Sequence, residues 1–339
     1  MKIPFEHRPA AHCESGVTSN MLRFYGLPMS EPMVLGLGSG LFFSHMPFIK
    51  LNGLAVTSFR PLPGQIFSRV TKGLGINVKR RWFLNKNKAM DALDALLAQG
   101  IPAGVLVGVY HLPYFPKEYR FHFNAHNICV TGKEEDDYLV SDPVVMEAVS
   151  ISYADLQRVR YAKGTWPPVG HMYWVKNGVR SSIDLRPIIV KAIKLNCKRM
   201  LDIPIPYFGI KGIRLLAERM ETWEKRYGSR KAALNLAQII RMLEEIGTGG
   251  AGFRFMYAAF LQEAADILKI QELHELSVRL TRVGDVWREF AAASARKFKE
   301  RGEQVSSYHQ LADLLVTIAD EEEQIFMSLR RCIDGRNYN

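Results

Sequence analysis

The sequence predicts an α+β domain followed by an all-α domain. In the first half, an amphipathic helix at residues 85–100, stopped by Gly100, leads into several apolar runs separated by charged or Pro/Gly turns. This order is typical of a helix packed on an antiparallel sheet. From Ile183 to Arg331, almost every segment has helical periodicity instead. We therefore predict domains at 1–178 and 179–339. The apolar runs expected to form strands or strand ends lie at residues 101–112, 121–132, 136–143 and 171–176.

A helix is expected to begin at or beside Cys13. Apolar residues recur at three- and four-residue spacing from Val17 to Tyr25, and Gly26 closes the pattern. A second, short helix is predicted at residues 30–38, with Ser30 as its cap. In the second half, the long amphipathic helices are expected within residues 230–247, 253–269, 273–298 and 307–333.

Charge and composition disfavour nucleic-acid-binding and membrane-bound classes of protein. The net charge is +11, yet there is no Lys/Arg-rich run beyond "VKRRWF" and no repeated aromatic-basic pattern, which disfavours nucleic acid as a partner. No apolar run has the length of a signal peptide or a membrane span, so we expect a cytoplasmic protein without a membrane partner. The four cysteines are far apart and are expected to be free thiols.

Cys13 has the position of a nucleophile. Unpaired amides and the positive end of the dipole at a helix start favour a thiolate. A small buried cysteine would explain the same position, and Glu14 would oppose a thiolate unless its side chain points away. A nucleophile here therefore needs a general base.

His126 and Asp142 are the candidate base and its orienting group. His126 begins the run "HNICVTG", and Asp142 ends the next predicted strand, "YLVSDP". Adjacent antiparallel strands would place the carboxylate beside the imidazole, as in cysteine enzymes that use a nucleophile, a base and an orienter. A structural histidine is the alternative interpretation of His126.

No metal or nucleotide site is predicted. His122 and His126 would stand about 13 Å apart along a strand, too far to share one ion. The glycines of "GLGSG" follow a helix rather than a strand and lack the spacing of a dinucleotide fingerprint. They are predicted to form a turn.

The order of these motifs resembles the papain-like fold, and within it the bacteriocin-processing peptidases. More specifically, "HCESGVTSNMLRFYGLPMSEPMVLGLGSGLFF" resembles the N-terminal domain of the butirosin-biosynthesis BtrH-like acyltransferase family. "GTGGAGFRFMYAAFLQEAA", Gly247 to Ala265, resembles that family's helical companion domain. The resemblance covers nearly the whole chain.

The resemblance implies a cysteine-dependent acyltransferase of specialised-metabolite biosynthesis, such as that of antibiotics. Cys13 would accept an acyl or aminoacyl group from a 4'-phosphopantetheine thioester, with His126 as base and then acid, and Asp142 as orienter. An amine would then take the group as an amide, without any other cofactor. The papain-like pattern also implies an oxyanion donor, commonly a glutamine six residues before the cysteine. Here His7 occupies that position, and His7, His12 or the Cys13 amide is expected to serve.

The helical domain would cover the site and exclude water. Its candidate substrate-binding residues are Gly249, Gly250 and Arg254, with an interdomain or surface salt bridge as the alternative role of Arg254. The partners expected are an acidic acyl carrier protein and a small-molecule amine. Lys79, Arg80 and Arg81 form a candidate docking patch for the carrier protein.

Two other function classes stay open. One is a cysteine peptidase or amidase that uses the same residues, and the other is a non-catalytic binding or scaffold protein that keeps the fold. The long helices could also pair two copies of the chain into a homodimer.

Overall fold

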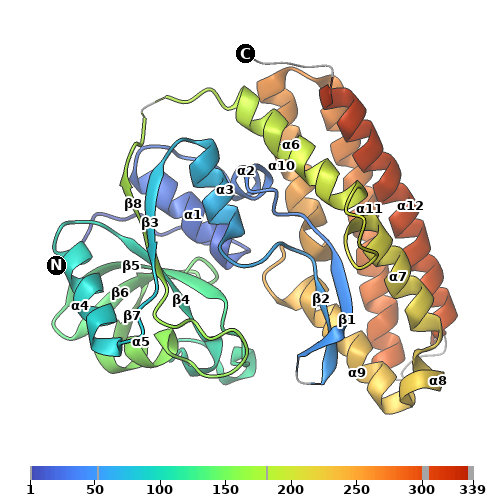
Figure 1. Cartoon of the computed structure of the whole chain (residues 1–339), viewed down its shortest axis with the longest axis horizontal. Helices are drawn as coiled ribbons and strands as arrows, with labels where there is room; N and C mark the ends of the chain where they lie inside the picture. Colours follow the sequence, from blue (N-terminus) through green and yellow to red (C-terminus); the bar gives the residue numbers. More distant parts are fainter. Residues whose placement is uncertain (1, 52, 181, 300–304, 335–339) are drawn as a thin grey trace. The chain divides into compact units, whose positions relative to one another are not determined.

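The chain divides into two units, each built from segments that are not continuous in sequence. The computed structural model describes residues 2–51, 53–180, 182–299 and 305–334. The first unit comprises Met1–Val34 and Phe67–Ile183, and the second comprises Leu35–Ile66 and Asp184–Asn339. Figure 1 labels their helices and strands. The α+β class with an antiparallel sheet and a helical C-terminal part is confirmed.

The first unit contains a six-stranded sheet in the order β3-β8-β4-β5-β6-β7. Every strand pairs with its neighbours in an antiparallel manner. The strands are β3 (Asn77–Arg81), β4 (Ala103–Val107), β5 (His126–Glu134), β6 (Asp137–Ser141), β7 (Val149–Ser152) and β8 (Met172–Asn177). The helices are α1 (Cys13–Phe24), α2 (Glu31–Leu37), α3 (Gln65–Gly73), α4 (Lys86–Leu97) and α5 (Tyr153–Arg160), of which α2 and α3 cross the unit boundaries.

The two faces of this sheet carry different residues. Val105 lies opposite Ile128, and both belong to the apolar core that α4 and α5 also enter. Because side chains alternate along a strand, Asn127 and Cys129 point to the other face, where α1 packs against β5. The sheet therefore separates an apolar core from the face that packs against α1.

Helix α1 begins at Cys13, as the sequence predicts. The His12 side chain caps it by accepting a hydrogen bond from the Ser15 N–H at 3.3 Å. At the other end, Gly26 has a φ of 82°, a conformation that glycine adopts without strain.

The second unit is helical apart from one antiparallel hairpin. None of the helices in the described ranges is long and apolar enough to cross a membrane. The hairpin is formed by β1 (Ser44–Leu51) and β2 (Leu54–Ser58). The helices are α6 (Arg186–Leu201), α7 (Gly209–Glu221), α8 (Trp223–Tyr227), α9 (Ser229–Ile240), α10 (Arg254–Leu268), α11 (Gln271–Lys299) and α12 (Tyr308–Asp334).

The placement of residues 35–66 corrects the predicted domains, which assigned them to the first domain. Gly36 lies so close to the ring of Phe260 that a Cβ would fall 2.1 Å from it. The Ser39 hydroxyl donates to the Ala192 carbonyl at 3.1 Å. These contacts attach the segment to the helical unit, and the hairpin within it was not predicted.

A buried ion pair lies in the core of the helical unit. Arg254 and Glu322 are both fully buried, and the guanidinium donates two hydrogen bonds to the carboxylate at 2.8 and 2.9 Å. The Trp287 indole N–H donates to the same carboxylate at 2.7 Å. The guanidinium also lies over the Trp287 ring, 4.9 Å from its centroid. Glu322 therefore joins three helices through hydrogen bonds to charged and polar groups.

We predict that Glu322→Leu lowers the free energy of unfolding by about 3–5 kcal/mol, because it leaves the Arg254 guanidinium buried without a counter-charge. The double variant Arg254→Met/Glu322→Leu removes both charges and should recover most of that loss. Urea denaturation followed by circular dichroism measures both values. A single variant as stable as the wild type would contradict this assignment.

Candidate active site

Cys13 is held at the start of α1 by a carboxylate from the neighbouring helix. Glu31 accepts hydrogen bonds from the N–H groups of Ala11 and His12 at 2.9 and 2.8 Å, and from the Ser15 hydroxyl at 2.9 Å. Burial raises the pKa of Glu31, although these three hydrogen bonds oppose the rise. The loop that enters α1 is therefore fixed immediately before the cysteine.

The Glu14 carboxylate binds the backbone of helix α3. It accepts a hydrogen bond from the Phe67 N–H at 3.1 Å, in the first turns of α3. Glu14 is fully buried. The carboxylate next to Cys13 in the sequence thus has a backbone partner on α3, and the expectation that it points away from the sulfur stays a prediction.

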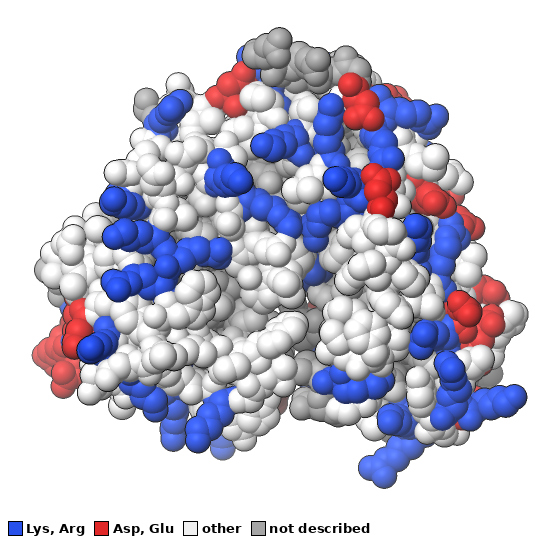
Figure 2. All heavy atoms as spheres, viewed as in Figure 1, with Lys and Arg blue, Asp and Glu red and all other residues white. Residues whose placement is uncertain are grey.

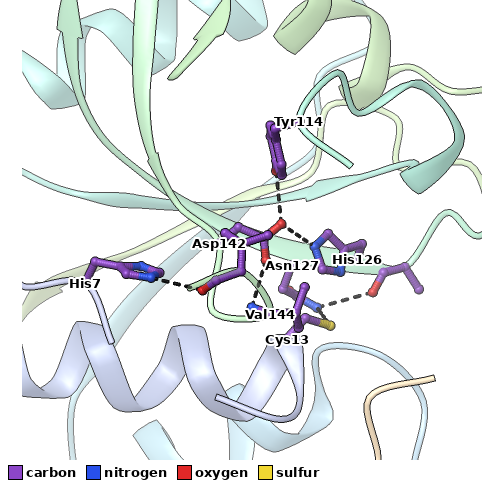
Figure 3. Close-up of polar contacts among 9 residues, drawn as sticks. His7, Cys13, Tyr114, His126, Asn127, Asp142 and Val144 are labelled. Atoms are coloured by element: carbon purple, nitrogen blue, oxygen red, sulfur yellow. Dashed lines mark hydrogen bonds and ion pairs between the residues drawn. The ribbon is translucent and has the colours of Figure 1, made fainter. Parts of the chain in front are cut away.

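His126 and Asp142 meet as the strand pairing predicts. His126 is the first residue of β5, Asp142 directly follows β6, and the two strands are neighbours in the sheet. The imidazole Nε2 lies 2.7 Å from the Asp142 carboxylate (Figure 3). The Tyr114 hydroxyl donates to the same carboxylate oxygen at 3.0 Å, and the Val144 N–H donates to the other at 3.2 Å. Two groups besides the imidazole, the Tyr114 hydroxyl and the Val144 N–H, therefore hold the Asp142 carboxylate in place.

The electrostatics of the site favour a protonated His126. Burial lowers the pKa of this imidazole, but the charge and hydrogen bond of Asp142, together with the Cys13 sulfur, outweigh burial and raise the pKa to about 10. Because Nε2 is bound to Asp142, Nδ1 is the ring nitrogen that can exchange a proton with the Cys13 sulfur. An imidazolium next to a cysteine stabilises the thiolate, which is the nucleophilic form.

The structure brings Cys13, His126 and Asp142 together, but it places the two predicted oxyanion histidines differently. His7 contacts the Ser141 hydroxyl at 2.8 Å and the Val145 carbonyl at 3.2 Å. The ring of His12 caps α1 through Ser15. Both ring nitrogens of His7 are thereby bound, whereas the capping contacts of His12 involve Nδ1, so the oxyanion role of His12 stays a prediction. The Cys13 amide stays a candidate, because the first amides of a helix point out of its start.

Sequence reasoning missed Asn127. Its side-chain nitrogen lies 3.9 Å from the Cys13 sulfur, and the residue is 1% exposed. The one available signal was its position directly after His126, on the opposite face of the same strand. Strand alternation alone does not show that the opposite face meets the helix start that carries the cysteine.

Of the three substrate-binding residues predicted in the helical half, Arg254 needs correction. Arg254 is bound to Glu322 within a core and is not exposed to a ligand. Gly249 and Gly250 have φ values of 68° and 87°, a left-handed conformation that favours glycine, and their substrate-binding role stays a prediction. The Thr248 hydroxyl accepts from the Gly250 N–H at 3.2 Å and stabilises that turn.

Two family models match the chain. Residues 12–143 match the model described as "Butirosin biosynthesis protein H, N-terminal". Residues 154–329, about half of the chain, match a domain family of unknown function, DUF4872. No curated protein matches the sequence. Among solved structures, a putative C39-like peptidase from Bacillus anthracis is 13% identical, with a TM-score of 0.37, over 52% of this chain and 99% of that one.

We predict that Asp142→Asn slows alkylation of Cys13 by iodoacetamide at pH 7 by about tenfold or more. An adjacent opposite charge typically shifts a pKa by about 1–3 units, and without it the burial of His126 lowers its pKa. The imidazolium is then lost at lower pH, and the thiolate loses its counter-ion.

Peptide mass spectrometry over a time course measures this rate. Cys129 and Cys197 serve as internal controls, because burial raises the pKa of Cys197 to about 12 and that of Cys129 further still. Equal alkylation of Cys13 in the wild type and Asp142→Asn would show that the carboxylate does not support the thiolate.

Proposed function

The chain belongs to the BtrH-like family, and we propose that it is a cysteine-dependent acyltransferase. Cys13 would take an acyl or aminoacyl group from a carrier-protein thioester and pass it to an amine. One observation carries the proposal. The buried His126 imidazole lies 2.7 Å from the Asp142 carboxylate and also interacts with Cys13, the first residue of α1. This arrangement supplies a nucleophile, a base and an orienting carboxylate.

The first half-reaction forms an acyl-enzyme. The Cys13 thiolate attacks the thioester carbonyl, a sulfur–carbon bond forms, and the carbonyl electron pair moves to oxygen. When the tetrahedral intermediate collapses, the bond to the pantetheine sulfur breaks. That thiolate leaves and takes the proton held by His126. The imidazole is then neutral and ready to act as a base.

The second half-reaction forms the amide. The incoming amine attacks the acyl-enzyme carbonyl, and neutral His126 removes a proton from the amine nitrogen. Collapse returns the Cys13 thiolate and leaves His126 protonated, as at the start. Asp142 stabilises this charge in both halves. A thioester already carries the activation energy for an amide bond, so no nucleotide or metal is needed.

We predict that the wild-type protein gains one acyl mass when it is incubated with simple acyl pantetheine thioesters, and that Cys13→Ala does not. Intact-mass spectrometry measures the adduct. Cys332→Ala, which removes a buried thiol of the helical unit, is the matched control and should gain the same mass as the wild type.

Addition of an amine separates transferase from hydrolase, which remains the alternative function of the same residues. A transferase discharges the adduct as an amide faster than water does. Discharge at the same rate with and without amine would favour a peptidase or amidase. The absence of any adduct would favour a binding or scaffold role. The role of the helical unit as a cover that excludes water stays a prediction.

An acidic carrier protein is the proposed donor partner, and the edge strand β3 is its proposed docking surface. Lys79 and Arg81 are exposed on β3, and Lys176 is exposed at the end of the paired strand β8. Figure 2 shows Lys and Arg side chains gathered over this part of the first unit. Arg80 does not belong to the patch as predicted, because its guanidinium lies over the Phe67 ring, 5.8 Å from the centroid.

We predict that Lys79→Glu/Arg81→Glu lowers kcat/KM for a carrier-bound acyl donor by about tenfold or more, because like charges slow an electrostatically steered encounter. The same variant should use a free pantetheine thioester normally. Lys211→Glu/Lys269→Glu makes the same charge change at exposed positions of the helical unit and is the control. An equal loss of kcat/KM with the carrier-bound and the free donor would overturn β3 as the docking surface. An equal loss in the β3 variant and the control variant would do the same.

A further inference from the structure

The side-chain amide of Asn127 lies beside the Cys13 sulfur. Its Nδ2 atom lies 3.9 Å from Sγ, and the side chain is almost fully buried. Figure 3 shows the amide nitrogen directed from β5 to the cysteine. Of the two histidines expected to supply this donor, His7 has both ring nitrogens bound, at Ser141 and Val145, and His12 caps α1 through Nδ1.

The orientation of the Asn127 amide is determined by its other two contacts. The nitrogen donates to the Ala125 carbonyl at 3.3 Å, and a carbonyl can only accept. The amide oxygen accepts from the Tyr173 hydroxyl at 2.9 Å. Burial raises the pKa of Tyr173 well above its usual value, so this hydroxyl keeps its proton. The nitrogen must therefore face the sulfur.

The Tyr173 ring is held in place by close packing against Gly104 and Phe67. Tyr173 lies opposite Gly104 in the pairing of β8 with β4, and a Cβ on Gly104 would fall 2.2 Å from the tyrosine ring. The ring also packs against Phe67, with centroids 4.5 Å apart. The Asn127 amide is thus supported by paired strands and by the buried side chains of Tyr173 and Phe67.

We propose that the Asn127 side-chain amide donates a hydrogen bond to the oxyanion that forms when Cys13 attacks a carbonyl. This inference rests on the proposed function. The carbonyl oxygen is attached to the carbon that bonds to Sγ, so an N–H that reaches the sulfur can also reach this oxygen. Negative charge appears on the oxygen as the sulfur–carbon bond forms and leaves it when the intermediate collapses. The amide stabilises this charge without a proton transfer.

The test compares two reactions of the same thiolate. Acylation by acetyl-pantetheine passes through an oxyanion, whereas alkylation by iodoacetamide displaces iodide without one. We expect Asn127→Ala to slow single-turnover acylation of Cys13 by about 100-fold or more, which is typical for loss of one oxyanion donor. Alkylation should stay within about twofold of the wild-type rate. Both rates are measured by intact-mass spectrometry after rapid mixing.

Two further variants complete the design. Tyr173→Phe keeps Asn127 but frees its amide, so acylation should slow by a smaller factor while alkylation is unchanged. This variant carries the test if Asn127→Ala does not fold. Asn235→Ala removes a buried asparagine from the helical unit and should leave both rates at wild-type values.

The outcomes separate this inference from the proposed function. Wild-type acylation that Asn127→Ala leaves unchanged would overturn the oxyanion role and keep the proposed function. A parallel fall of acylation and alkylation would also overturn it, because it would show a role in thiolate stability or folding. If the wild type is not acylated at all, the proposed function fails, and the oxyanion role fails with it.

Discussion

The His126 imidazole and the Asp142 carboxylate meet at 2.7 Å, almost wholly removed from solvent, and the rest of the site depends on this contact. Burial lowers the pKa of the imidazole, whereas the Asp142 carboxylate and the Cys13 sulfur together raise it to about 10. A charged imidazolium can then stabilise a thiolate on Cys13. The Tyr114 hydroxyl and the Val144 N–H also donate to this carboxylate, so both of its oxygens are hydrogen-bonded.

The first unit can be understood as the support that this contact requires. The antiparallel pairing of β5 with β6 brings a histidine and an aspartate that are 16 residues apart to the same end of the sheet. Helix α1 packs on β5 and presents Cys13 from its first turn. Glu31 fixes the loop before that turn, and Glu14 binds the backbone of α3. Glu31 and Glu14 thus have different roles, because each carboxylate binds a different part of the backbone.

Much of this arrangement could be predicted from local pattern. Helix α1, the order of β4, β5 and β6, and the likeness to the family were accessible because they depend on periodicity and on motifs along the chain. The attachment of residues 35–66 to the helical unit depends instead on the fit of Gly36 against Phe260, far apart in sequence. The burial of Arg254 depends on Glu322, 68 residues away. Asn127 was missed for the same reason, since its importance arises from what faces it across the sheet. The oxyanion role of His7 was implied by the resemblance to the papain-like pattern, but here both of its ring nitrogens bind other groups, at Ser141 and Val145.

The most direct test of the central claim is a nitrogen-15 NMR titration of His126, with its resonances identified by their loss in His126→Gln. The account predicts that the imidazole stays protonated through neutral pH and loses its proton only near pH 10. An imidazole that titrates at about 6.5, the ordinary value for histidine, would contradict the account. It would show that Asp142 does not hold the charge on which a Cys13 thiolate depends.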